Sequence, residues 1–120
     1  MKSILIVDDS NTNVVLLEAI LNNRGYDIRT SMSVQEATQI MAHKQPSLIL
    51  LDLLMPQISG YQFLDQIKKN DKTKHIPVIV ISAVTDAMNI KKTLDMGAVD
   101  YIEKPVDIKE LIKKVEQTLN

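Results

Sequence analysis

Three acids, one hydroxyl and one amine directly follow apolar or strand-like stretches of this sequence. They are Asp8, Asp9, Asp52, Ser82 and Lys104. Carboxylates held close together repel one another, so they either share protons or bind a cation. Because the candidate ligands are oxygens and the chain has no cysteine, we expect Mg2+ or Mn2+ rather than zinc. With Lys104 and Ser82 to hold phosphoryl oxygens, the set indicates phosphoryl transfer to an aspartate.

Each of these residues also has a purely structural explanation when it is taken alone. Asp8 and Asp9 precede a predicted helix and could cap its free amide groups. Asp52 could lie in a turn, Ser82 could cap a helix, and a lone lysine such as Lys104 is usually a solvated surface charge. Structural needs would not place three acids face to face, so their joint placement favours a chemical site.

The strands that must position these side chains are short apolar runs. The expected strands cover residues 4–7, 27–31, 48–51, 78–81 and 99–103. The runs at 4–7, 48–51 and 78–81 show no alternation of apolar and polar residues, which is typical of strands buried on both faces. Residues 27–31 are partly polar, so we expect that strand near an edge of the sheet.

Amphipathic segments with recognisable ends lie between the strands. The first expected helix covers residues 11–24 and the third covers residues 60–69. The second begins at Ser33, the fourth ends at Gly97, and the fifth begins at Asp107. Gly25 suits a left-handed helix end, and the pairs Ser33 with Glu36 and Asp107 with Glu110 have capping-box spacing. Strands alternating with helices predict a doubly wound α/β fold, with a parallel sheet covered on both faces. Ligands of such folds bind at the carboxyl ends of the strands, where the polar residues stand.

Size and charge limit the other possibilities. A chain of 120 residues with 45% hydrophobic residues predicts a single domain, residues 1–120, without a linker or repeat. A net charge of −1 gives no general attraction to nucleic acid or to an anionic membrane. The apolar run at residues 4–7 is too short for a signal peptide or a membrane span, so we expect a cytoplasmic protein.

Four motifs in order resemble those of the receiver domains of two-component response regulators. They are ILIVDDS at residues 4–10, LLDLLMP at 50–56 followed by Gly60, VISA at 80–83 and GAVDYIEKP at 97–105. The resemblance covers essentially the whole chain and implies a five-stranded sheet of flavodoxin-like order 2-1-3-4-5 with five helices. It also implies phosphorylation of Asp52 by a histidine kinase or a histidine phosphotransfer protein.

The same resemblance assigns roles to individual residues. Asp8, Asp9, Asp52 and the backbone carbonyl of Leu54 would bind Mg2+, with Asp9 as a direct ligand and Asp8 acting through water. Lys104 and Ser82 would contact the phosphoryl group, and the Lys104–Pro105 bond would be cis.

The resemblance further implies a conformational switch. Ser82 would move toward the phosphoryl group and Tyr101 would turn inward, which would alter the face built from the fourth helix, the fifth strand and the fifth helix. The downstream target of this face is unknown, and the chain would be a monomer or a weak dimer linked to phosphorylation.

One departure and several alternatives remain open. Leu54 places an apolar side chain beside Asp52, and our hypothesis is that it hinders the attacking water and prolongs the life of the phosphoform.

A flavin-binding electron carrier would need a Gly-rich phosphate loop where Asp8 and Asp9 stand, and aromatics are only 3%. A small phosphohydrolase with an Asp nucleophile would normally carry Asp-x-Asp after its first strand. A binding module that is never phosphorylated would not need the acids. We therefore expect a timed signal rather than an enzyme that turns over a separate substrate.

Overall fold

Strands and helices alternate along the chain in this computed structural model, which describes residues 2–55, 59–83 and 86–120. The strands are β1 (Ser3–Val7), β2 (Asp27–Ser31), β3 (Leu48–Leu51), β4 (Val78–Ser82) and β5 (Asp100–Glu103). The helices are α1 (Asn11–Asn22), α2 (Val34–His43), α3 (Gly60–Lys69), α4 (Ala87–Asp95) and α5 (Ile108–Leu119). The predicted α/β alternation is confirmed, and each expected strand begins or ends within one residue of the observed one.

The five strands form one parallel sheet in the order β2-β1-β3-β4-β5. This is the predicted flavodoxin-like order, and β2 lies at an edge as its polar composition predicts. The chain runs from β1 to β2 on one side and then crosses to β3 on the other. The carboxyl ends of β1 and β3, which lead into Asp8 and Asp52, therefore flank the point where ligands bind in doubly wound sheets.

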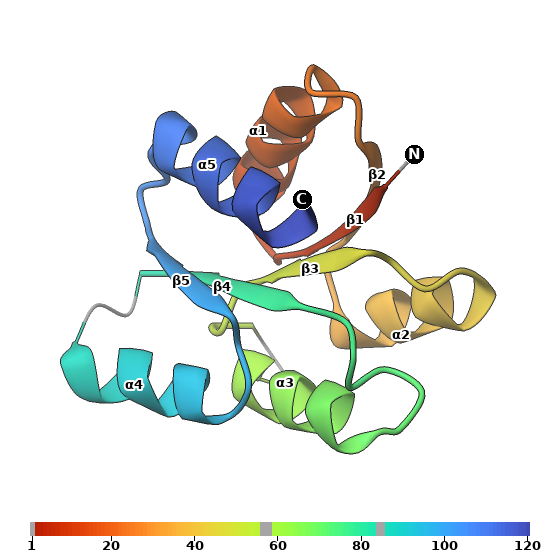
Figure 1. Ribbon diagram of the computed structural model, residues 1–120, viewed down its shortest axis with the longest axis vertical. Helices are drawn as coiled ribbons and strands as arrows, with labels where there is room; N and C mark the ends of the chain where they lie inside the picture. Colours follow the sequence, from red (N-terminus) through yellow and green to blue (C-terminus); the bar gives the residue numbers. More distant parts are fainter. Residues whose placement is uncertain (1, 56–58, 84–85) are drawn as a thin grey trace.

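Helices cover both faces of the sheet. Figure 1 shows α1 and α5 on one face and α2, α3 and α4 on the other. In β1, Ile4 and Ile6 pack into the core beneath α1 and α5, whereas Leu5 and Val7 pack beneath α2 and α3. Burial on both faces is the physical reason why the central strands are continuously apolar.

The helix ends agree with the sequence in kind and differ in detail. The side chains of Ser33 and Asp107 accept hydrogen bonds from the amides of Glu36 and Glu110, as the spacing predicts. Both halves of a capping box are present at Ser59, which the sequence analysis had not identified. The first helix ends at Asn22, two residues earlier than expected. Gly25 has a φ of 86°, which is the left-handed conformation that was predicted for it.

No helix in the described part of the chain has both the length and the apolar composition needed to cross a bilayer.

Gly60, the first residue of α3, packs directly against the backbone that carries Asp52. Its amide donates to the carbonyl oxygen of Leu53 at 2.9 Å. A Cβ atom at this position would collide with the carbonyl oxygen of Asp52 and with the Cα atom of Leu53. The close approach of two backbones fixes the distance between α3 and the end of β3, so a side chain here must displace Asp52.

We therefore predict that Gly60→Ala lowers the free energy of unfolding by about 2 kcal/mol or more. Gly25→Ala is the matched control, because a Cβ there meets no atom within 4 Å and introduces only backbone strain. Urea unfolding of both variants measures the difference. Equal losses of stability in the two variants would contradict the close packing of Gly60 on Asp52.

Candidate functional site

The backbone hydrogen bonds of the sheet continue past the strand ends and hold the polar residues in place. The amide of Asp8 donates to the carbonyl oxygen of Ser31 at 3.1 Å, and the amide of Asp52 donates to that of Val7 at 2.9 Å. The amide of Lys104 donates in the same way to Ser82 at 2.9 Å. These residues are therefore fixed by neighbouring strands, and their positions do not depend on loop conformation.

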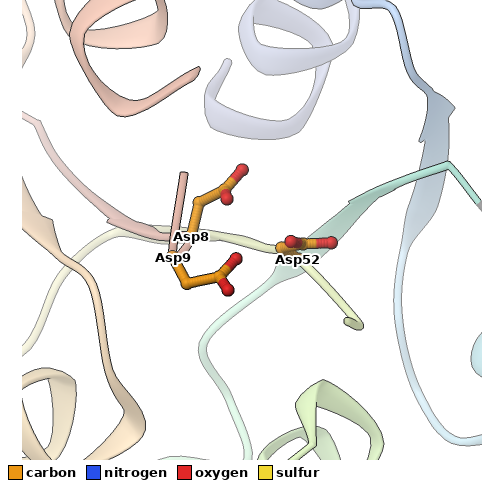
Figure 2. A group of neighbouring side chains, drawn as sticks. All are labelled: Asp8, Asp9 and Asp52. Carbon is orange, nitrogen blue, oxygen red and sulfur yellow. The ribbon is translucent and has the colours of Figure 1, made fainter. Parts of the chain in front are cut away.

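The three predicted acids come together at the carboxyl edge of the sheet. One carboxylate oxygen from each of Asp8, Asp9 and Asp52 lies within 4.8 Å of the others. Figure 2 shows the three side chains gathered at the ends of β1 and β3. Asp8 and Asp52 are buried, with 2% and 4% of their surface exposed, whereas Asp9 is exposed. The group could hold a metal ion that is approached from the side of Asp9.

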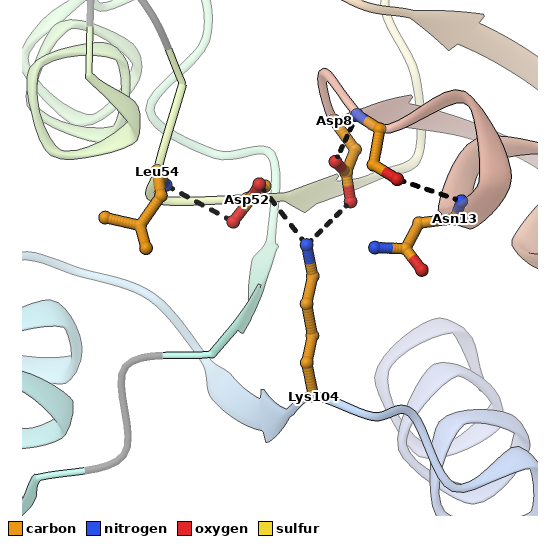
Figure 3. Close-up of polar contacts among 6 residues, drawn as sticks. Asp8, Asn13, Asp52, Leu54 and Lys104 are labelled. Carbon is orange, nitrogen blue, oxygen red and sulfur yellow. Dashed lines mark hydrogen bonds and ion pairs between the residues drawn. The ribbon is translucent and has the colours of Figure 1, made fainter.

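Lys104 reaches between the two buried acids. Its Nζ atom lies 3.1 Å from Oδ2 of Asp8 and 3.3 Å from Oδ2 of Asp52, as Figure 3 shows. The lysine side chain is itself only 18% exposed, and the Lys104–Pro105 bond is cis as expected. Two buried carboxylates thus share one ammonium group, which leaves the site short of positive charge.

The shortage of positive charge is most evident at Oδ2 of Asp8. Within the described residues this buried oxygen has no hydrogen-bond partner, although it lies 3.1 Å from the ammonium of Lys104. The contact is therefore an ion pair without the alignment of a hydrogen bond. The other oxygen, Oδ1, accepts the amide of Ser10 at 2.9 Å. A buried carboxylate oxygen with unused lone pairs, beside two further acids, fits a hard cation such as Mg2+.

The environment of Asp52 disfavours its charge. Burial raises the pKa of Asp52, and the nearby charge of Asp8 raises it further. Lys104 and the amide of Leu54, which donates to Oδ1 at 3.2 Å, lower the pKa by smaller amounts. Without a cation, Asp52 therefore holds its proton more tightly than an ordinary aspartate.

Leu54 contributes its backbone to the site, and its side chain is open to solvent. The side chain is 55% exposed, and Figure 3 shows the amide nitrogen, not the side chain, turned toward Asp52. The contact that is observed is the hydrogen bond from the amide of Leu54 to Asp52. Metal binding by the carbonyl of Leu54 stays a prediction.

Ser10 has a role that sequence reasoning missed. Its hydroxyl accepts the amide of Asn13 at 3.4 Å and so caps α1, while its own amide binds Asp8. The structural alternative for the acid pair, in which Asp8 or Asp9 caps the helix, is therefore not needed. The signal was present in the sequence, because serine is a preferred N-cap residue and stands directly before Asn11.

Ser82 and Tyr101 lie next to each other in the core. Ser82 ends β4 and is fully buried, and Tyr101, in the neighbouring strand β5, is 6% exposed. Burial raises the pKa of Tyr101, whereas a side-chain hydrogen bond with Ser82 acts in the opposite direction. The two residues expected to move together are thus in contact, and Tyr101 already lies in the buried position that we expected it to reach only on phosphorylation.

Comparison with known proteins gives the family of this fold and site. The model of the response regulator receiver domain matches residues 4–116. Response regulator PleD of Caulobacter vibrioides is 38% identical over 112 residues, which cover 93% of this chain and 25% of that protein. Protein PilH of Pseudomonas aeruginosa is 32% identical, and the match covers 99% of this chain and 98% of that protein.

A solved structure agrees with these relatives. The signal receiver domain of a signal transduction histidine kinase from Syntrophus aciditrophicus superimposes with a TM-score of 0.90 and 33% identity, over 99% of this chain and 90% of that one. This chain spans only about a quarter to a half of the length of several curated relatives, such as PleD. On the family match and the shared fold, the chain belongs to the receiver domains of two-component response regulators.

Proposed function

We propose that Asp52 accepts a phosphoryl group from the phosphohistidine of a histidine kinase or a histidine phosphotransfer protein, in a reaction that requires Mg2+. The observation that carries this proposal is the burial of Asp52 between the ammonium of Lys104 and the carboxylate of Asp8. This arrangement excludes water from a nucleophile and supplies positive charge where phosphoryl oxygens would arrive.

The residues of the chain account for most of the transfer step. A carboxylate oxygen of Asp52 forms a bond to phosphorus as the bond from phosphorus to the donor histidine nitrogen breaks, and that nitrogen leaves as imidazole. The amide of Leu54 holds Oδ1 of Asp52, which limits rotation of the carboxylate before attack. Lys104 stabilises charge on the transferring oxygens, and Ser82 donates its hydroxyl to one of them.

Mg2+ would be held by the carboxylates of Asp8, Asp9 and Asp52 and by the backbone carbonyl of Leu54, and Mn2+ could replace it. Bound there, it would neutralise charge on the phosphoryl oxygens. The exposure of Asp9 supports its role as the ligand that meets the ion first, whereas Asp8 is already engaged with Lys104 and Ser10.

The proposed output is regulatory. On phosphorylation Ser82 would move toward the phosphoryl group, and Tyr101, already buried beside it, would repack into the space released. This change would alter the face formed by α4, β5 and α5, which a downstream protein would read. We expect this domain to bind neither nucleic acid nor membrane. We expect a monomer or a weak phosphorylation-linked dimer, in the cytoplasm where the expected phosphodonors act.

The direct test is incubation with acetyl phosphate and Mg2+ followed by intact mass measurement. We expect a gain of one phosphoryl group that is lost in Asp52→Asn. Asp71→Asn is the matched control, because this side chain is 91% exposed in a distant loop and its variant should be phosphorylated normally. Continuous release of phosphate without an adduct would contradict the proposal and favour a small phosphohydrolase. Failure to react with any phosphodonor would favour a binding module.

The raised pKa of Asp52 predicts how stability depends on metal and pH. The folded chain binds this proton more tightly than the unfolded chain, so stability falls as pH rises through the folded pKa. Without metal at pH 7, Asp52→Asn should therefore be more stable than wild type by about 1 kcal/mol. The difference should vanish at acid pH below the unfolded pKa. Added Mg2+ should stabilise wild type by roughly 2.7 kcal/mol at 100 times its Kd, and the variant much less.

Thermal unfolding with EDTA or Mg2+, across a pH series, measures these differences. A variant that is less stable than wild type at pH 7 without metal would contradict the charge shortage inferred for the site.

The side chain of Leu54 stands two residues after Asp52 and is open to solvent, and its proposed role is to hinder the water that attacks the phosphoform and so prolong its lifetime. An asparagine at this position could hydrogen-bond the attacking water, so Leu54→Asn should speed loss of the phosphoryl group by roughly threefold or more, the scale of one hydrogen bond. Val15→Asn is the control, because Val15 is as exposed as Leu54, lies on α1 outside the face formed by α4, β5 and α5, and should leave the decay rate unchanged. A decay rate in Leu54→Asn that is equal to or slower than wild type would refute the role given to Leu54.

A further inference from the structure

The first turn of α4 is held mainly by polar contacts. Of the nine residues of α4, only Thr93 is buried, and Met88 in the first turn is 85% exposed. A helix with so little apolar burial opens locally at low cost. Apart from Ile90, which is partly buried against the core, the first turn is therefore held by side-chain hydrogen bonds and charges.

Those hydrogen bonds converge on Asn89. The N-cap residue Asp86 accepts the amide of Asn89 at 2.9 Å on Oδ1 and the side-chain nitrogen of Asn89 at 2.7 Å on Oδ2. The remaining polar atom of that side chain, Oδ1, accepts the hydroxyl of Tyr61 at 3.1 Å. The carboxylate of Asp86 can only accept, so the nitrogen of the Asn89 side chain must face Asp86, and Oδ1 is left to accept the hydroxyl of Tyr61. Tyr61 thus holds the far side of the residue that closes the helix cap.

The ring of Tyr61 makes a second contact with the same helix. Nζ of Lys92 lies 4.8 Å from the ring centroid, within the range of a cation–π interaction. Lys92 lies three residues after Asn89, so the hydroxyl and the ring of Tyr61 hold successive turns of one face of α4. The hydroxyl and ring contacts can therefore be separated by substitution.

The other end of this link lies at Asp52. Tyr61 directly follows Gly60, which packs against the carbonyl of Asp52 and donates its amide to Leu53 at 2.9 Å. A shift of the backbone at Asp52 must move the start of α3, because no space separates them. The same network lies near the switch pair, since Tyr61 and the carboxylate of Asp86 add to burial in raising the pKa of Tyr101.

We propose that Tyr61 is a positioning residue that ties the first turn of α4 to the backbone of Asp52, so that occupancy of the Asp52 site and the position of α4 are coupled through α3. This route is separate from the contact between Ser82 and Tyr101. It rests on the proposed function only for the identity of the occupant, a phosphoryl group.

Hydrogen exchange resolved by NMR tests this link in the whole chain. The reporters are the amides of Asn89 and Ile90, both of which donate to Asp86. In Tyr61→Phe, which keeps the ring over Lys92, these amides should exchange roughly threefold to tenfold faster than in wild type. Amides of β1 and β3 should be unchanged, which excludes general loss of stability. Tyr26→Phe is the matched control and should leave all of these rates as they are.

The second arm adds Mg2+ and beryllofluoride, a mimic of the phosphoryl group. Binding should change the exchange of Asn89 and Ile90 in wild type, and this change should be at least roughly halved in Tyr61→Phe. Equal exchange of α4 in wild type and Tyr61→Phe without ligand overturns the proposal, and so does an equal response to beryllofluoride. A wild-type chain that does not bind beryllofluoride overturns the phosphoacceptor function instead. The comparison without ligand then still decides whether Tyr61 holds α4.

Discussion

Two buried carboxylates held against a single lysine ammonium form the constraint on which the rest of this structure depends. Asp8 and Asp52 lie 3.1 and 3.3 Å from Nζ of Lys104, and the exposed Asp9 adds a third negative charge nearby. An arrangement of this kind costs stability unless further positive charge arrives. The same deficit suits a site that binds a cation and then a phosphoryl group, so function and local instability have one physical cause.

The fold supplies the rigidity that keeps these charges together. Backbone hydrogen bonds continue beyond the strand ends to Asp8, Asp52 and Lys104, and the apolar strands beneath them are buried on both faces. Gly60 adds a second support by bringing the start of α3 against the backbone of Asp52. Repulsion between the acids is therefore resisted by the whole sheet and cannot be relieved by movement of one loop.

Much of this arrangement could be predicted from the sequence because it depends on local patterns. Continuous apolar runs identify strands buried on both faces, and the residue that follows each run must lie at the same edge of a parallel sheet. The contact of Tyr61 with Asn89 spans 28 positions and leaves no periodic trace in the sequence. The packing of Gly60 on Asp52 likewise depends on the distance between two elements. The end of α1 was placed two residues late because Gly25 marks the left-handed turn, which begins after the last helical residue.

Titration of the Asp52 carboxyl carbon by NMR, in metal-free protein, tests the central claim most directly. If two buried acids share one lysine, the pKa of Asp52 must lie above that of an ordinary aspartate and must fall when Mg2+ is added. A pKa at or below the ordinary value in the absence of metal, or one that does not respond to Mg2+, would contradict the charge shortage at this site.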